Sequence, residues 1–186
     1  MGLPGFAGKD DLVMGSVTGV RWWKVHPGGL AGAYGHIWCH GRNEARCGKS
    51  HPNRWPHNVT WINGEPVALE QPDRPNEENH VPGDHCECGF WAYWDLKENF
   101  FSYDNGHILV CGIIEGTGRV LIGERGFRSQ YAEITALHVE FPWEQELQSL
   151  WAPALNTLKQ QYPDTRFYTD PARMLADHPT DREDAT

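Results

Sequence analysis

A ten-residue stretch, residues 80–89 (HVPGDHCECG), constrains the fold of this chain more than any other feature. It holds two thiols and two imidazoles, and it follows a further cysteine, Cys47. In an extended strand alternate side chains point to the same side, so Cys86 and Cys88 can reach one ion together. A disulfide between them is disfavoured, because so small a ring strains the dihedral angle that a disulfide requires. The stretch therefore predicts a bound metal ion.

The residue types favour zinc. Zinc takes four nitrogen or sulfur ligands in a tetrahedron, and a Cys3His set would consist of Cys47, His80, Cys86 and Cys88. Gly83 and the proline before it favour the sharp bend that brings His80 back toward Cys86. Four protein ligands leave no position for water, which is typical of a structural zinc site.

Two positions of this ligand set have competitors. Cys39 competes with Cys47, and three histidines compete with His80: His51, His57 and His85. The C-x-C spacing also differs from the commoner C-x2-C zinc pattern. The alternative is that these are ordinary buried thiols and surface histidines, and Cys111, inside an apolar run, is predicted to be such a thiol.

The composition indicates a single globular domain. A chain of 186 residues can bury a core of its own, and the 9 Trp, 7 Phe and 6 Tyr predict that aromatic packing forms much of it. With 16 basic and 25 acidic residues the net charge is -9, which repels a phosphate backbone. A protein partner is therefore expected and a nucleic acid is not.

The five cysteines indicate a reducing compartment, because an odd number spread in this way does not form a disulfide framework. Residues 1–16 contain no apolar segment, so neither a signal peptide nor a membrane anchor is expected. No run approaches the ~20 apolar residues that span a bilayer. We expect a cytoplasmic protein without a membrane contact.

Short β-strands are predicted over most of the chain. Residues 17–25 and 30–38 flank a Pro-Gly-Gly turn and predict a hairpin, whereas residues 39–85 resemble a long loop that needs something to staple it. A β meander follows, with strands predicted at residues 90–94, 108–115, 119–122 and 127–137. Residues 123–126 (GERG) predict a four-residue hairpin loop, and Gly116-Thr117-Gly118 predicts a turn.

The C-terminal part changes to a helical period. Apolar residues form one stripe over residues 143–162, where Pro153 is expected to kink the helix or split it into two. Residues 166–169 predict a short edge strand, and Asp170 with Pro171 predicts the start of a helix over residues 172–177.

The predicted fold class is therefore α+β: a small antiparallel β-sheet or partly open barrel, stapled by a zinc site, with a C-terminal helical segment. Three parts are expected: a flexible N-terminal lead at residues 1–16, a single domain at 17–178 and a charged tail at 179–186.

Several motifs in one order resemble a family of small, largely uncharacterised proteins of actinobacteria and their phages. The matching segments are residues 43–47 (NEARC), His80 with Pro82, residues 86–92 (CECGFWA) and residues 124–132 (ERGFRSQYA). Phe90-Trp91-Ala92 replaces an aliphatic-Tyr-Ala run of the family, Thr117 replaces a tryptophan, and residues 51–79 resemble an insertion. The resemblance covers about residues 17–165 and implies the ligand order Cys47, His80, Cys86, Cys88. It also implies a phage or mobile-element origin, and then a bacterial host cytoplasm.

The favoured function is a non-enzymatic protein-binding module with a structural zinc site, acting on a host protein if the origin is a phage. The alternative is a zinc-dependent hydrolase or deaminase-like enzyme, because Glu87 lies between two predicted ligands. The deaminase signature H-x-E with P-C-x-x-C is absent from the sequence, as is H-E-x-x-H. A further polar group, Glu124, Arg125 and Arg128, brackets the predicted hairpin tip.

Overall fold

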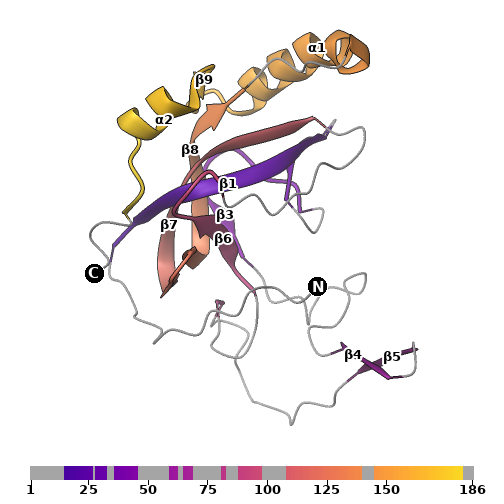
Figure 1. The fold of residues 1–186 in the computed structure, drawn as a ribbon, viewed down its shortest axis with the longest axis vertical. Helices are drawn as coiled ribbons and strands as arrows, with labels where there is room; N and C mark the ends of the chain where they lie inside the picture. Colours follow the sequence, from indigo (N-terminus) through magenta and orange to yellow (C-terminus); the bar gives the residue numbers. More distant parts are fainter. Residues whose placement is uncertain are drawn as a thin grey trace.

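The computed structural model describes residues 15–26, 28–32, 36–45, 81–82, 88–97, 108–139 and 145–181, and gives the backbone alone for 59–62, 65–68 and 145–150. These residues form a mostly antiparallel sheet with two helices toward the C-terminal end (Figure 1). The predicted α+β class is confirmed. The main sheet is partly ring-like and is not a barrel.

The N-terminal hairpin forms as predicted, but its second arm is short. Strand β1 (Val17–His26) pairs with β2 (Gly29–Ala31), with Val25 opposite Leu30. Instead of a strand over residues 30–38, one bridge follows between Ala31 and Ile37. The rest of β1 pairs with β7 (Leu109–Gly123) over eight positions.

A long hairpin of β7 and β8 (Gly126–His138) forms the centre of the sheet, and two predictions about it are wrong. Gly123 and Gly126 pair with each other, so the loop has two residues and not four. The turn predicted at residues 116–118 is also absent, because β7 continues through it with a register shift between Thr117 and Val120. Gly118, with φ +77, accommodates this bulge.

The remaining strands close and extend the sheet. Strand β6 (Phe90–Tyr93) pairs with β8 along four positions and touches β1 at Val20 opposite Tyr93, so β1, β7, β8 and β6 form an incomplete ring. Farther along the same side of β8 lie β3 (Asn43–Glu44) and then β9 (Arg166–Tyr168), the latter parallel to β8. Strands β4 (Val59–Ile62) and β5 (Glu65–Ala68) form a separate two-stranded sheet.

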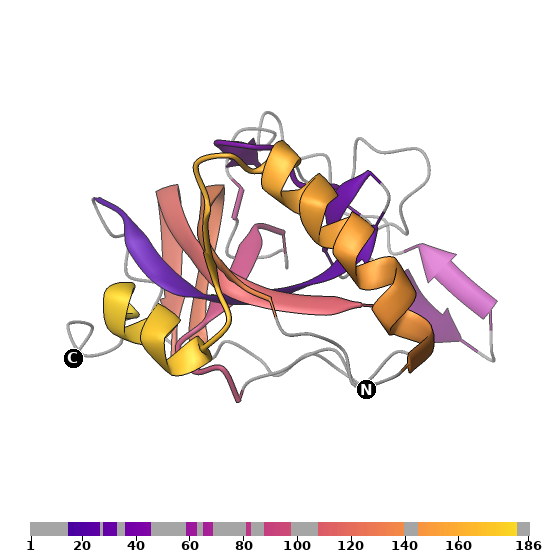
Figure 2. The ribbon, with the colours of Figure 1, turned by 90° about the horizontal axis from the view of Figure 1, so that it is seen from above.

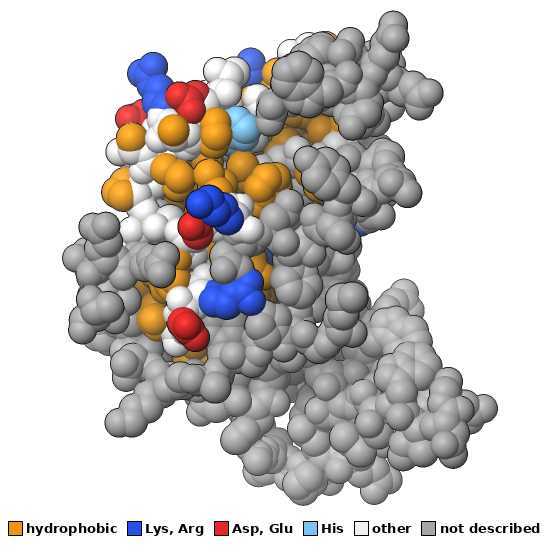
Figure 3. All heavy atoms as spheres, viewed as in Figure 1, with side chains coloured by type: hydrophobic (Ala, Val, Ile, Leu, Met, Phe, Trp, Pro, Cys, Tyr) orange, Lys and Arg blue, Asp and Glu red, His pale blue; other side chains and the backbone are white. Residues whose placement is uncertain are grey.

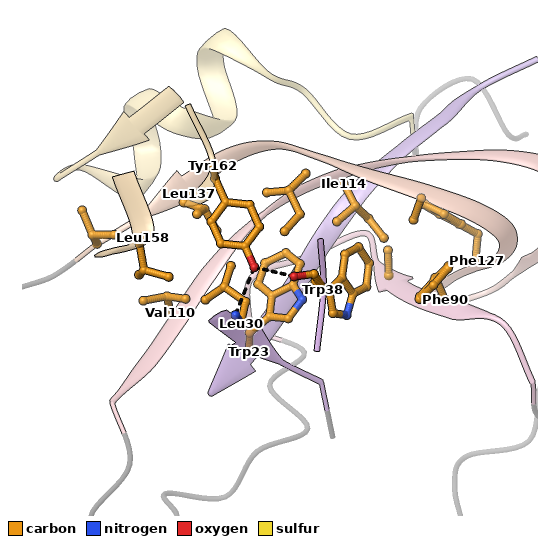
Figure 4. Close-up of a cluster of buried hydrophobic side chains, with 14 of the residues drawn as sticks. Trp23, Leu30, Trp38, Phe90, Val110, Ile114, Phe127, Leu137, Leu158 and Tyr162 are labelled. Carbon is orange, nitrogen blue, oxygen red and sulfur yellow. Dashed lines mark hydrogen bonds between the residues drawn. The ribbon is translucent and has the colours of Figure 1, made fainter. Parts of the chain in front are cut away.

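The main apolar cluster lies on what we call the inner face of the sheet, and aromatic residues form much of it, as predicted (Figure 4). The rings of Trp23 and Trp38 meet edge to face at 5.3 Å between centroids, and Trp38 lies 4.6 Å from Phe90. Helix α1 (Gln145–Gln161) contributes Trp151 and Leu158 to this cluster. It runs unbroken through Pro153, so the predicted split into two helices does not occur.

Tyr162, directly after α1, joins the helix to the sheet. Its phenol is buried, donates a hydrogen bond to the carbonyl oxygen of Trp38 at 2.8 Å and accepts one from the backbone N–H of Leu30 at 3.1 Å (Figure 4). Burial raises the pKa of this phenol above its ordinary value of 10.0, because the charged phenolate would lose its hydration.

A second, smaller cluster lies on the opposite, outer face of the sheet and consists of Val20, Cys111, Ile113, Ala136 and Met174. Met174 belongs to α2 (Pro171–Asp177), which covers this face, while α1 crosses another part of the sheet (Figure 2). The start of α2 is as predicted: the Asp170 carboxylate accepts a hydrogen bond from the N–H of Ala172 at 2.9 Å, and Pro171 follows the cap.

Candidate metal centre

The structure describes one of the four predicted zinc ligands, Cys88. It lies two residues before β6 and is 6% exposed. Cys47, His80 and Cys86 lie outside the described residues, and so do three of their competitors and the glutamate of the enzyme hypothesis: His51, His57, His85 and Glu87. Among the described residues, no three His, Cys, Asp or Glu side chains are grouped as a metal ion would require.

Two chain segments that lead to predicted ligands reach the same stretch of β8 from opposite ends. Strand β3 runs antiparallel to β8 with Glu44 opposite Tyr131, and the N–H of Ala45 then donates to the carbonyl oxygen of Gln130 at 2.8 Å. Strand β6 begins with Phe90 opposite Ser129. Ala45 and Phe90 therefore meet neighbouring residues on one edge of β8.

A third segment lies against the same place. Gly89 has φ +122, a conformation that favours glycine, and a side chain there would meet Pro82 Cβ at 3.1 Å, Arg128 Cβ at 3.3 Å and Ser129 O at 3.3 Å. Val81 and Pro82 are both buried. Ala45 and Phe90 thus meet residues 129–130 of β8, and Pro82 lies against Gly89 beside them.

Arg128 gives this region a buried positive charge. Its side chain is 6% exposed, stacks over the Trp91 ring at 5.3 Å and donates a 3.5 Å hydrogen bond to the carbonyl oxygen of Cys88. The expected polar group at the hairpin tip is therefore incomplete. Glu124 and Arg125 are exposed at the turn, whereas Arg128 lies under the neighbouring strand.

Cys39, the competitor of Cys47, is exposed on a turn that Asn43 holds. The Asn43 side chain accepts a hydrogen bond from the N–H of Cys39 at 2.8 Å and donates to the carbonyl oxygens of Cys39 and Gly41 at 3.1 and 3.0 Å. The neighbouring His40 contacts Asp164 at 3.0 Å, and both side chains are exposed. Within the described part of the chain, Cys39 joins no group of three potential ligands.

One contact between a thiol and an imidazole was not predicted from the sequence. Cys111 and His138 are paired across β7 and β8, with 3.6 Å between Sγ and Nδ1. Cys111 is buried, as predicted, but its imidazole neighbour is 27 residues away in the sequence. Continuous pairing from Gly123 opposite Gly126 places Cys111 opposite His138, because the two register shifts of the hairpin cancel, so the turn expected at residues 116–118 is what hid the pair.

Comparison with protein-family models, with curated proteins and with solved structures found no match for this chain. Among the described residues, no helix has the length and apolar character to cross a membrane.

Proposed function

We propose that this protein is a non-enzymatic protein-binding module in which a structural zinc ion closes the long segment between β3 and β6. The ligands we propose are Cys47, His80, Cys86 and Cys88. The observation that carries this proposal is the convergence of three chain segments on residues 128–130 of β8.

Covalent reach supports the ligand set. Cys47 lies two residues beyond Ala45, His80 directly precedes the buried Val81, and Cys86 lies two residues before Cys88. Two residues of chain span at most about 7 Å. Each of the three ligands outside the described residues is therefore tethered within that distance of a residue anchored beside β8.

The charge of the region also supports it. A zinc ion with three thiolates and one neutral imidazole carries one net negative charge. The Arg128 guanidinium donates to the backbone of Cys88, so its positive charge lies close enough to stabilise such a site. Residues next to metal ligands commonly tune a site in this way.

A closed site favours a structural role over hydrolysis, since all four positions are occupied by protein. Action would then rest on a surface that the zinc site holds in place. The net charge of -9 suits a basic protein partner. The resemblance to actinobacterial and phage proteins adds the proposal that this partner is a host protein.

Elemental analysis of protein purified without chelator tests the zinc proposal. We expect about one zinc per chain and a large fall in melting temperature on chelation, because structural zinc contributes about 10 kcal/mol or more to folding. Cys47→Ser and Cys88→Ser should lose the ion, whereas Cys39→Ser and Cys111→Ser should keep it. Metal-free wild-type protein would refute the proposal.

X-ray absorption at the zinc edge separates the two functional classes. Three sulfur ligands and one nitrogen ligand support the structural module. An oxygen ligand in place of one of them would instead favour the hydrolase or deaminase-like enzyme. Affinity capture from an actinobacterial lysate, with zinc-depleted protein as the control, then identifies the partner, whose binding should weaken with salt.

A further inference from the structure

The outer face of the sheet carries a pair of side chains that the proposed function does not use. Cys111 on β7 lies 3.6 Å from Nδ1 of His138 on β8, and the two residues are direct cross-strand neighbours. Cys111 is 2% exposed and His138 is 9% exposed. An imidazole in contact with a thiol can accept its proton, which leaves the nucleophilic thiolate.

What covers the thiol is a short C-terminal segment. Met174 of α2 is fully buried in the same cluster as Cys111, and Leu175 packs against that cluster. We call residues 170–181 the C-terminal strap. Figure 3 shows apolar side chains gathered around α2 and the strands beneath it, and half-buried residues of this cluster include Trp22 and Tyr168.

Polar contacts cap the start of α2 and join the later residues of the strap to the rest of the protein. At the start of α2, Asp170 caps the N–H of Ala172, and at its end the Tyr168 hydroxyl donates to Asp177 at 3.0 Å. Beyond the helix, Thr180 donates to the carbonyl oxygen of Trp94 at 3.1 Å, and the Asp181 carboxylate accepts a 2.6 Å hydrogen bond from the N–H of Thr18.

We expect the strap to open more readily than the sheet beneath it, for two reasons. A helix of seven residues does not hold its shape alone, so α2 exists because it is docked. The strands beneath it belong to a sheet that is paired on both sides. Segments of this kind open locally, at a lower free energy than unfolding of the whole domain.

We infer that Cys111 and His138 form a latent reactive-thiol site, which the C-terminal strap covers, for a small disulfide. When the strap opens, His138 takes the thiol proton and the Cys111 sulfur attacks one sulfur of the disulfide. The S–S bond of the disulfide breaks, a mixed disulfide forms at Cys111, and the other half leaves as a thiolate. The proton remains on His138 until it passes to solvent. No outside oxidant beyond the disulfide itself is needed.

Oxidised glutathione added to the full-length protein tests this site, with modification measured for each cysteine by peptide mass spectrometry. Asp170→Ala removes the helix cap and Asp181→Ala removes the latch to β1. Each should raise the modification rate of Cys111 about fivefold, the change in opening expected for the loss of one such contact. Asp164→Ala is the matched control, since Asp164 contacts only the exposed His40 in the described structure and should leave that rate unchanged.

Two further measurements keep the result interpretable. The exposed Cys39 serves as an internal standard whose modification rate should be equal in all variants. Adding His138→Gln to the Asp181→Ala protein should lower the Cys111 rate about tenfold, because the general base is lost. The inference would be overturned if both strap variants modified Cys111 no faster than the control does. It would also be overturned if His138→Gln left the modification rate of Cys111 unchanged. Both modification rates are independent of zinc, so a failure of this inference can be distinguished from a failure of the proposed function.

Discussion

A few buried polar side chains determine how the layers of this protein are joined. Tyr162 connects the end of α1 to two backbone groups of the sheet layer, and Asn43 holds the turn that leads into β3. Arg128 lies where three segments meet. Each of these three side chains is buried, and removing one leaves the backbone groups that it contacts without that hydrogen bond.

Tyr162→Phe should lower the free energy of unfolding by about 1–3 kcal/mol, because Leu30 N–H and the Trp38 carbonyl lose a buried partner. The raised pKa of Tyr162 has a further consequence. The folded state retains the phenol proton at pH values where the unfolded chain has lost it, so this contribution is complete below pH 10.0 and is lost as pH rises above it.

Urea unfolding of both proteins between about pH 8 and pH 11 measures the two effects. The alkaline fall in stability should be smaller in Tyr162→Phe than in the wild type. Tyr131→Phe is the control: its ring stacks under Arg42 at 4.3 Å, and the change should cost less than about 0.5 kcal/mol. Parallel pH curves for wild type and Tyr162→Phe would contradict the assignment.

Arg128→Met should weaken zinc binding about tenfold or more, because the variant keeps much of the apolar length and loses the charge beside the thiolates. Arg125→Met, at the exposed hairpin turn, is the matched control and should bind zinc as the wild type does. Competition against a chromophoric chelator gives both affinities. Equal affinities in the two variants would show that Arg128 does not balance the charge of the metal site.

At the scale of elements, glycines set how closely the strands pack. A side chain at Gly126 would lie against the carbonyl oxygen of Ala92, where β6 pairs with the start of β8. One at Gly116 would meet Phe127 and Ser129 inside the sheet. These positions are closed by backbone and core atoms and not by φ, so the requirement there is for space.

Gly126→Ala should therefore destabilise the protein by about 3 kcal/mol, since β6 must move away from β8 to make room. Gly28→Ala is the control, because among the described residues, its chain neighbours aside, a side chain there would meet one atom within 4 Å, His26 Nδ1 at 3.6 Å. Thermal unfolding followed by circular dichroism compares them. A melting temperature for Gly126→Ala equal to that of Gly28→Ala would show that β6 and β8 do not approach so closely.

The sequence predicted elements whose signals are local. The N-cap at Asp170 and the helical stripe ending near Tyr162 are examples, because each depends on residues within a few positions. The bulge of β7 was misread as a turn, since a Gly-x-Gly sequence is compatible with both and only pairing with β8 decides between them. The pairing of Val20 with Tyr93, which closes the ring of strands, leaves no local pattern in the sequence. Of the candidate site, the ligand role of Cys88 stays a prediction, and its buried neighbour Arg128 was assigned to a hairpin tip because no local pattern marks it as buried.

At the scale of the molecule, the two ends of residues 46–80 are anchored close to the same stretch of β8, through Ala45 on one side and Val81 and Pro82 on the other. A short connection can span ends that lie close together, and the cost of loop closure changes slowly with loop length. The sheet therefore does not depend on how long this segment is.

Replacing residues 51–79, the stretch that resembles an insertion, with about six Gly and Ser residues should leave the fold and one zinc per chain intact. The expected readouts are an unchanged dispersion of the amide NMR spectrum for the sheet and an unchanged zinc content. Loss of folding would show that this stretch supports the sheet. Loss of zinc alone would place a ligand among its histidines, His51 or His57.

The order of the strands in the incomplete ring also determines at which point during synthesis the sheet can form. β1 leaves the ribosome well before most of its partners, which are residues 109–116 of β7 and Tyr93 of β6. Trp22 and Trp23 pair with Cys111 and Val110, so they stay without their partner strand until residues 110–111 have been made. Such late, long-range pairing slows folding and leaves apolar strands exposed during synthesis. We therefore expect β1 to be the strand of the main sheet that stays unpaired longest during synthesis.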